Sequence, residues 1–192
     1  MLIDYVRAWQ TAPAVVTGPG DVAAAGGIYT LKADGVSDLY DFRNAATFLT
    51  MDASGLGTAG THTVYAGPAG SDVHGGPGTV NFAGSAGVDT FTFGSGMSRA
   101  MGGAGNDVFV MASGAIAAGN QIIDFHVNLG NGTEHDMLRL TGFSAAAHFD
   151  YVSSSGAVQY YHVVDGAQVS PLIGIQVANG TGHLGPLDYQ FG

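Results

Sequence analysis

The sequence predicts an all-β protein, a right-handed parallel β-roll closed by an antiparallel β cap. Three observations lead to this prediction. Glycine is abundant, with 32 residues in a chain of 192. Apolar residues recur at a fixed place in a nine-residue repeat, and short strand-like segments separated by turn residues follow that repeat. Stacked short strands with alternate residues facing inward are the structure that such a pattern favours.

The repeat runs from about residue 57 and divides into seven segments: GTAGTHTVY, AGPAGSDVH, GGPGTVNFA, GSAGVDTFT, FGSGMSRAM, GGAGNDVFV and MASGAIAAG. Glycine usually holds the fourth place, and the eighth place holds Val64, Phe82, Phe91 and Phe109. Glycine suits tight turns, and the apolar eighth residue suits the inward face of a short strand. Two segments make one coil, so every second segment stacks on the same side.

Aspartates gather on one side of the predicted roll, at Asp72, Asp89, Asp107 and Asp124. Stacked strands lie ~4.8 Å apart, and carboxylates at that spacing repel one another. A Ca²⁺ ion between successive coils would remove the repulsion and bind carboxylate and carbonyl oxygens. The sequence therefore predicts about three intercoil calcium sites.

The predicted metal-site residues are the four aspartates, Asn106 and the turn glycines, namely Gly67, Gly84, Gly87, Gly102, Gly103 and Gly105. Calcium is predicted on this side alone, because the equivalent places on the opposite side hold His62, Val80, Ser98 and Ile116. None of these is a hard anionic ligand. The alternative is a degenerate roll that binds little metal, since Pro68 and Ser85 depart from the repeat.

The segment 102–110 matches the pattern G-G-x-G-x-D-x-U-x completely and resembles the calcium-binding nonapeptide of RTX (hemolysin-type) proteins. Residues 121–125 and 136–143 resemble the passage that closes many RTX rolls, in which Asp136 is expected to support the same end. Residues 187–192 resemble the end of type I secretion substrates. The resemblance implies export by type I secretion machinery while unfolded, and folding on calcium outside a Gram-negative cell.

The first strand-like segment, LIDYVRAWQ, is similar to the last strand of glycoside hydrolase family 16 jelly rolls. The matching residues are Ile3, Asp4, Tyr5, Val6, Arg7 and Gln10, while Ala8 and Trp9 depart. This resemblance implies a secreted glycanase whose catalytic carboxylates lie outside this chain. The alternative is an ordinary first strand of the present domain.

The domain organisation follows from these segments. We expect a remnant jelly-roll strand over 1–10, a linker over 11–20, N-terminal cap strands over 21–56, the calcium roll over 57–125, and a C-terminal cap with a secretion-signal-like end over 126–192. The cap is expected to contain antiparallel strands joined by Gly-containing turns.

Several classes of function are excluded by composition. Five basic residues and a formal net charge of −10 argue against a nucleic-acid partner. No run approaches ~18 apolar residues, so no membrane span is expected, and the absence of cysteine excludes disulfides and thiolate sites. The histidines lack H-x-x-H spacing, and no G-x-S-x-G motif occurs. We therefore expect no complete enzyme.

The predicted function is that of a non-catalytic calcium-binding module of a secreted polysaccharide-degrading enzyme. The alternative is a carbohydrate-binding module that anchors the enzyme on its polysaccharide, as similar rolls in alginate epimerases do. An exposed stripe of aromatic or cationic side chains along the roll would favour that alternative. The candidates in the sequence are Arg99 and His74.

Overall fold

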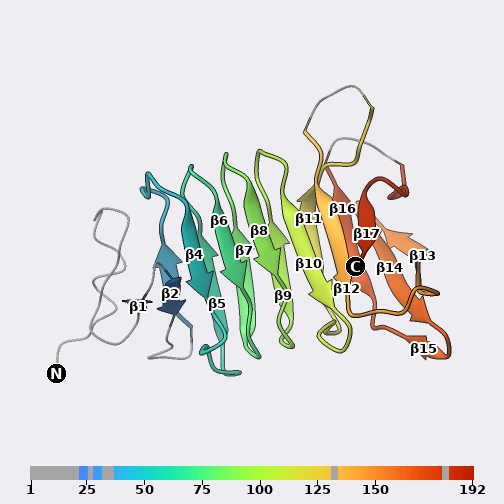
Figure 1. Cartoon of the computed structure of the whole chain (residues 1–192), viewed down its shortest axis with the longest axis horizontal. Helices are drawn as coiled ribbons and strands as arrows, with labels where there is room; N and C mark the ends of the chain where they lie inside the picture. The colour runs from blue at the N-terminus through green and yellow to red at the C-terminus, as the bar shows by residue number, and fades with distance from the viewer. Residues whose placement is uncertain (1–21, 26–27, 32–36, 131–133, 179–181) are drawn as a thin grey trace.

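The structure, a computed structural model, describes residues 22–25, 28–31, 37–130, 134–178 and 182–192. The predicted remnant strand over 1–10 and the linker over 11–20 lie outside these residues. All the described elements are β-strands, without any helix, and the chain advances along one long axis from its N-terminal to its C-terminal end (Figure 1). The predicted all-β fold is therefore confirmed.

The strands form two sheets, and from β2 to β12 successive strands alternate between them. The first sheet contains, in order, β1 (Val22–Ala25), β2 (Ile28–Leu31), β4 (Leu49–Asp52), β6 (Ser71–His74), β8 (Asp89–Thr92), β10 (Val108–Ala112), β12 (Met137–Thr141) and β17 (Tyr189–Phe191). The second contains β13 (His148–Ser155), β14 (Val158–Asp165), β16 (Ile173–Val177), β11 (Gln121–Phe125), β9 (Ser98–Met101), β7 (Thr79–Ala83), β5 (Thr61–Tyr65) and β3 (Leu39–Asp41), with β15 (Gln168–Val169) beside β14.

Parallel pairing joins each coil to the next. In the first sheet β4, β6, β8 and β10 are parallel neighbours, and in the second sheet β5, β7, β9 and β11 are. Ser71 and Asp89, which are 18 residues apart, are register partners in adjacent coils. Two nonapeptides therefore make one coil, and the predicted parallel β-roll is confirmed.

The core lies between the two sheets and is filled by the apolar residues of the repeat. Val64, Phe82, Phe91 and Phe109 are all buried, because alternate strand residues face inward. The Phe82 and Phe91 rings stack with their centroids 5.2 Å apart. Full burial of each such side chain stabilises the fold by about 1.5–3 kcal/mol.

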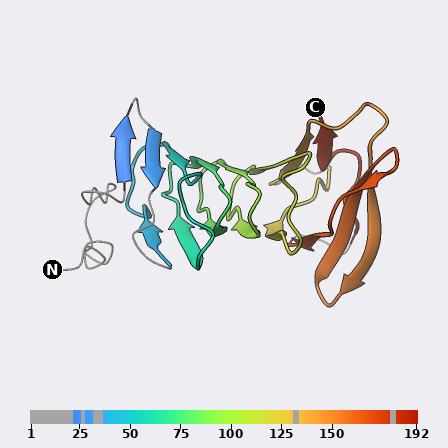
Figure 2. The same cartoon turned by 90° about the horizontal axis from the view of Figure 1, so that it is seen from below.

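Antiparallel strands lie at both ends of the roll. β1 pairs antiparallel with β2, and β14 pairs antiparallel with both β13 and β16. The β13–β14 hairpin extends beyond the body of the roll (Figure 2). The predicted antiparallel C-terminal cap is therefore present.

Parallel stacking extends past the predicted roll boundaries of 57 and 125 in both directions. It begins with the pairing of β2 with β4 and of β3 with β5, and it continues through β12 to β17. Strands before residue 57 keep the alternation of the repeat without its glycines, since Tyr40, Leu49 and Met51 are buried. A glycine motif therefore marks tight turns, whereas the apolar alternation sets the extent of the stack.

Candidate metal centre

One edge of the roll carries a column of buried polar side chains, at the turns that lead from the second sheet to the first. The column consists of Ser71, Asp89, Asp107 and Asp136, each at most 1% exposed. Ser71 Oγ donates to Asp89 Oδ1 at 2.6 Å, the Asp89 amide donates to Asp107 Oδ1 at 2.8 Å, and the Asp107 amide donates to Asp136 Oδ1 at 2.9 Å. Each carboxylate is thus held by the backbone or side chain of the preceding coil.

At this edge, turn glycines leave space for oxygen atoms because they have no Cβ atom. A Cβ atom added at Gly84 would overlap the carbonyl oxygen of Gly102 and would lie 2.5 Å from Asp89 Oδ2. A Cβ atom added at Gly102 would overlap Asp107 Oδ2. Carbonyl and carboxylate oxygens therefore face the space beside these two glycines, and any larger residue would fill it.

One oxygen of the column is left without a partner. Asp107 Oδ2 is buried and has no hydrogen-bond partner among the described residues. A buried charged group without a partner is strongly unfavourable, so the carboxyl group needs either a proton or a cation. Asp107 is therefore the residue at which a bound cation would have the largest effect.

The pKa values of the column reflect the same burial. Burial, followed by the negative charges of neighbouring carboxylates, raises the pKa of Asp107 to about 8. Burial raises the pKa of Asp136 to about 6 and that of Asp89 above its usual value. Without a cation, the folded roll thus favours protonated carboxyl groups.

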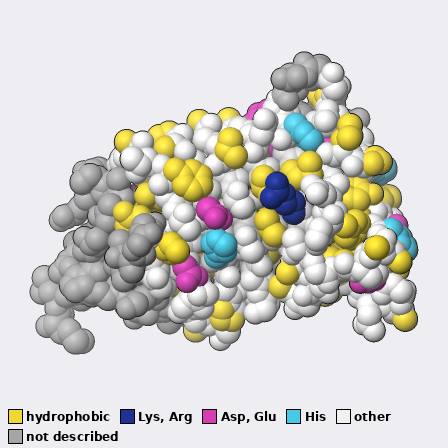
Figure 3. All heavy atoms as spheres, viewed as in Figure 1, with side chains coloured by type: hydrophobic (Ala, Val, Ile, Leu, Met, Phe, Trp, Pro, Cys, Tyr) yellow, Lys and Arg dark blue, Asp and Glu magenta, His cyan; other side chains and the backbone are white. Residues whose placement is uncertain are grey.

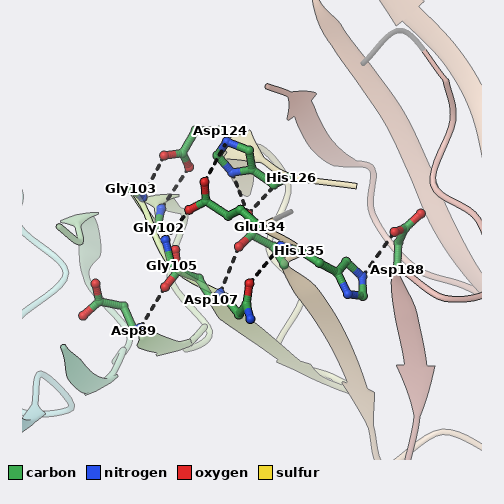
Figure 4. Close-up of polar contacts among 12 residues, drawn as sticks. Asp89, Gly102, Gly103, Gly105, Asp107, Asp124, His126, Glu134, His135 and Asp188 are labelled. Atoms are coloured by element: carbon green, nitrogen blue, oxygen red, sulfur yellow. Dashed lines mark hydrogen bonds and ion pairs between the residues drawn. The ribbon is translucent and has the colours of Figure 1, made fainter. Parts of the chain in front are cut away.

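Carboxylates from the following coil accept hydrogen bonds from the backbone of the 102–107 turn (Figure 4). Asp124 accepts hydrogen bonds from the amides of Gly102 and Gly103 at 2.9 and 2.8 Å, and Glu134 accepts one from the Gly105 amide. The N–H groups of Gly102, Gly103 and Gly105 are therefore bound to carboxylates, and the carbonyl oxygens of these three glycines can face other ligands. The turn is therefore fixed before any ion binds.

Two histidines continue these contacts toward the C-terminal end of the roll. His126 Nδ1 lies 3.3 Å from Asp136 Oδ2, and His135 Nε2 lies 3.4 Å from Asp188 Oδ1. The His135 amide donates to Asn106 Oδ1 at 2.9 Å. The predicted ligand Asn106 thus positions the backbone at His135, and Asp136 lies at the end of the column as expected.

The other predicted glycines also lie at intercoil contacts. Gly67 offers its carbonyl oxygen to Ser85 Oγ at 2.7 Å. A Cβ atom added at Gly87 would overlap the backbone of Gly70, and one added at Gly103 would overlap the carbonyl oxygen of Ser85. Ser85, a departure from the repeat, therefore supports the stack through its hydroxyl group.

Asp72 does not belong to the column, contrary to its predicted place. It lies 17 residues before Asp89 in a coil of 18, and a shift by one residue turns a strand side chain to the other face. Its Oδ2 contacts His74 Nε2 at 3.3 Å on the outer face of β6, while its Oδ1 is buried without a hydrogen-bond partner among the described residues. Ser71 takes the column position instead, and counting 18 residues back from Asp89 would have found it.

Asp124 is also outside the column, for a different reason: it lies on β11 of the second sheet, where it accepts hydrogen bonds from the start of the 102–107 turn, and is not in line with Asp107. The column continues at Asp136, 29 residues after Asp107, because the intervening turn is longer. Glu134, which the prediction omitted, lies in that longer turn. Its only sequence signal was that no other glutamate occurs in the chain.

The opposite edge of the roll differs from its prediction at two places. The residue next to Ser98 in the following coil is Asn120 and not the predicted Ile116, and the Ser98 amide donates to Asn120 Oδ1 at 2.8 Å. His62 is fully buried there, with its Nδ1 atom 3.0 Å from Asp38 Oδ2. One carboxylate therefore lies near this edge, at its N-terminal end.

Side chains alone do not form a metal site in the part of the chain that the structure describes. No three His, Asp or Glu side chains there are arranged as a group that would hold an ion. Each intercoil gap beside Asp107 is bordered by two carboxylates of the column, so carbonyl oxygens would have to complete any site. Such an oxygen-rich set suits Ca²⁺, which accepts mixed carboxylate and carbonyl ligands.

Comparison with protein-family models, with curated proteins and with solved structures finds no match to this chain. Within the described ranges, no helix has the length and apolar character needed to cross a membrane. The site is therefore interpreted from its own geometry.

Proposed function

We propose that the chain is a non-catalytic calcium-binding β-roll module whose fold is completed by Ca²⁺. The observation that carries the proposal is the unpartnered, buried Asp107 Oδ2 within a column of carboxylates. The Gly102 carbonyl oxygen, which lies beside Gly84 near Asp89 Oδ2, supports it, because it would offer a neutral ligand in the same gap. The two gaps that flank Asp107 have carboxylates on both sides, whereas the gap at Ser71 has one.

The proposed role is folding after export. Where calcium is scarce, the carboxylate column opposes folding, and where calcium is near-millimolar, the ion binds only the folded roll and stabilises it by mass action. The similarity of residues 187–192 to type I secretion substrates supports export as an unfolded chain. The similarity of residues 3–10 to a family 16 glycanase strand supports attachment to a polysaccharide-degrading enzyme.

Calcium titration of the full chain tests this proposal. We expect isothermal calorimetry to detect at least two Ca²⁺ ions. At a hundredfold excess over Kd, each site should add about 2.7 kcal/mol to the free energy of unfolding, a rise in Tm on the order of 10 °C for two sites. Circular dichroism in calcium, magnesium and chelator provides the measurement. Equal Tm values in calcium and chelator would rule the proposal out.

A second candidate function is polysaccharide binding, which a row of outward side chains on the second sheet favours. Thr63, Asn81, Arg99 and Gln121 are register neighbours on successive strands. The row ends at a hollow of about 370 Å³ beside Gly174, lined in part by Gln121, Tyr160, Pro171 and Leu172. Amide and guanidinium groups suit sugar hydroxyls, and the tyrosine ring suits the C–H face of a sugar.

The predicted stripe candidates lie on different sheets, since Arg99 is on β9 and His74 on β6. Only Arg99 therefore belongs to this row. The chain has five basic residues and a formal net charge of −10, and basic side chains are sparse on the one face of the molecule that Figure 3 shows. A neutral polymer is therefore a better ligand than an acidic one.

Affinity electrophoresis distinguishes the two functions. If the second holds, gels containing a neutral polysaccharide should retard the calcium-loaded chain, and Arg99→Ala and Tyr160→Ala should reduce the retardation. Arg139→Ala is the matched control, because Arg139 is exposed on β12 of the other sheet. Absence of retardation by any polymer, in a chain shown to be folded, would leave the calcium-dependent folding role alone.

A further inference from the structure

Three metal-ligating side chains meet on the outer face of the β13–β14 hairpin, far from the carboxylate column in the sequence. Asp150 on β13 is the direct cross-strand partner of His162 on β14. His148 lies two residues before Asp150 on the same strand, and alternate residues of a strand share a face. The three side chains therefore form a triangle on one surface.

The two imidazole groups approach the same carboxylate oxygen. His148 Nε2 lies 3.3 Å from Asp150 Oδ2, and His162 Nε2 lies 3.9 Å from it. The side chains of His148, Asp150 and His162 are 57%, 45% and 26% exposed, so an ion can reach them from solvent. The formal net charge of −10 favours any cation at this surface.

The inner face of the hairpin is fixed by packing. Phe149, between the two β13 ligands, is 8% exposed, and Tyr161, beside His162, is 2% exposed. Their rings stack with centroids 4.8 Å apart and an interplanar angle of 9°. The backbone that carries all three side chains is thus held in place, which reduces the conformational cost of binding an ion.

We propose that His148, Asp150 and His162 bind Zn²⁺ or a similar divalent transition-metal ion. Two imidazole nitrogens and one carboxylate oxygen are typical zinc ligands, and water would take the fourth position. Calcium prefers oxygen ligands, so this site and the carboxylate column select different ions. As they lie in the structure, these three side chains are not arranged as a group that could hold an ion. Binding therefore requires the His162 ring, whose Nε2 atom is 3.9 Å from Asp150 Oδ2, to move closer to Asp150.

Such an ion would crosslink β13 to β14. β13 is the last strand of the second sheet and pairs with β14 alone. The metal would therefore hold the outermost strand of the cap on the roll. This role does not depend on calcium binding, because the ligands and the ion are different.

The test is calorimetry with ZnCl₂ on the full chain in excess calcium, with Co²⁺ absorption as a second readout. We expect one Zn²⁺ ion per chain and tetrahedral Co²⁺ bands. His148→Ala and His162→Ala should each weaken Zn²⁺ binding at least tenfold. Both substituted side chains are at least partly exposed, at 57% and 26%, so circular dichroism should show folded proteins.

The matched control is His74→Ala. His74 makes the same kind of surface contact, with its Nε2 atom 3.3 Å from Asp72 Oδ2 and its side chain 50% exposed. Its register partner on β4 is a second carboxylate, Asp52, so this site has one imidazole group where the hairpin has two. We expect unchanged Zn²⁺ affinity in this variant. Absence of Zn²⁺ binding to the wild-type chain, or an equal loss in His74→Ala, would overturn the proposal without affecting the calcium result.

Discussion

Replacing Asp107 by asparagine is expected to remove most of the calcium-dependent stabilisation of the roll. Asp107 borders both gaps that have carboxylates on each side, so its loss weakens two sites together. Since each saturated site contributes about 2.7 kcal/mol, we expect the calcium-dependent gain in the free energy of unfolding to fall by more than half. Denaturant unfolding in calcium and in chelator measures the gain.

The same substitution should have the opposite effect when calcium is absent. Asparagine keeps the oxygen that accepts the Asp89 amide, whose present distance to Asp107 Oδ1 is 2.8 Å, and it carries no charge to be desolvated. In chelator at pH 8, Asp107→Asn should therefore be more stable than the wild type by roughly 1–3 kcal/mol. A loss of stability in both conditions would show that Asp107 is structural and not a calcium ligand.

Asp72→Asn is the matched control for this experiment. It makes the same chemical change one residue away from the column, at a side chain that is 32% exposed. We expect the calcium-dependent gain to stay within about 0.5 kcal/mol of the wild-type value. A loss as large as that in Asp107→Asn would place Asp72 among the ligands after all.

The stability of the calcium-free chain should fall as pH rises from 5 to 8. The pKa values of Asp107 and Asp136 are raised by burial to about 8 and about 6, above the usual value of 3.8. Their protonated forms stabilise the fold fully below pH 4, and this contribution is lost as pH passes about 6 and then about 8. The expected loss is on the order of 3 kcal/mol, measured by denaturant unfolding in chelator.

Calcium should reverse this dependence, because the ion binds the deprotonated carboxylates. In saturating calcium, the free energy of unfolding should rise between pH 5 and 7, and calorimetry in buffers of different ionisation enthalpy should detect proton release on binding.

The pKa values of Asp41, Asp52 and Asp165 are lowered by hydrogen bonds at the surface. Their contribution is lost only below about pH 4, outside the tested range. A calcium-free chain with constant stability from pH 5 to 8 would contradict the burial of the column.

The fold could be predicted from the sequence because the repeat carries both parts of the coil. The glycines mark the turns, and Phe82, Phe91 and Phe109 mark the inward face of the strands. This periodicity, together with the resemblance of residues 102–110 to the RTX nonapeptide, predicted the stacking. The coils before residue 57 were missed as coils because they lack the glycines and retain only the apolar alternation.

The candidate site was predicted in part, for a physical reason that concerns register. Asp89 and Asp107 lie in coils of equal length, so counting residues placed them in line. Asp72 was assigned from a spacing of 17, which strand alternation does not tolerate. Asp124 was assigned from the same spacing, but it still belongs to β11 of the second sheet. The longer turn before Asp136 cannot be measured by counting, because only the folded structure shows which residues of that turn leave the stack.

Antiparallel strands follow the parallel stack in one sheet at each end of the roll. A parallel stack of coils has no natural limit, because the last coil always offers the edge to which another coil can be added. Here β1 reverses direction against β2 in the first sheet, and β14 reverses direction against β16 in the second sheet. The other two edge strands of the described roll, β3 and β17, are parallel to their neighbours. At each end, one of the two sheets therefore lacks the parallel neighbour on which a further coil of the repeat would stack.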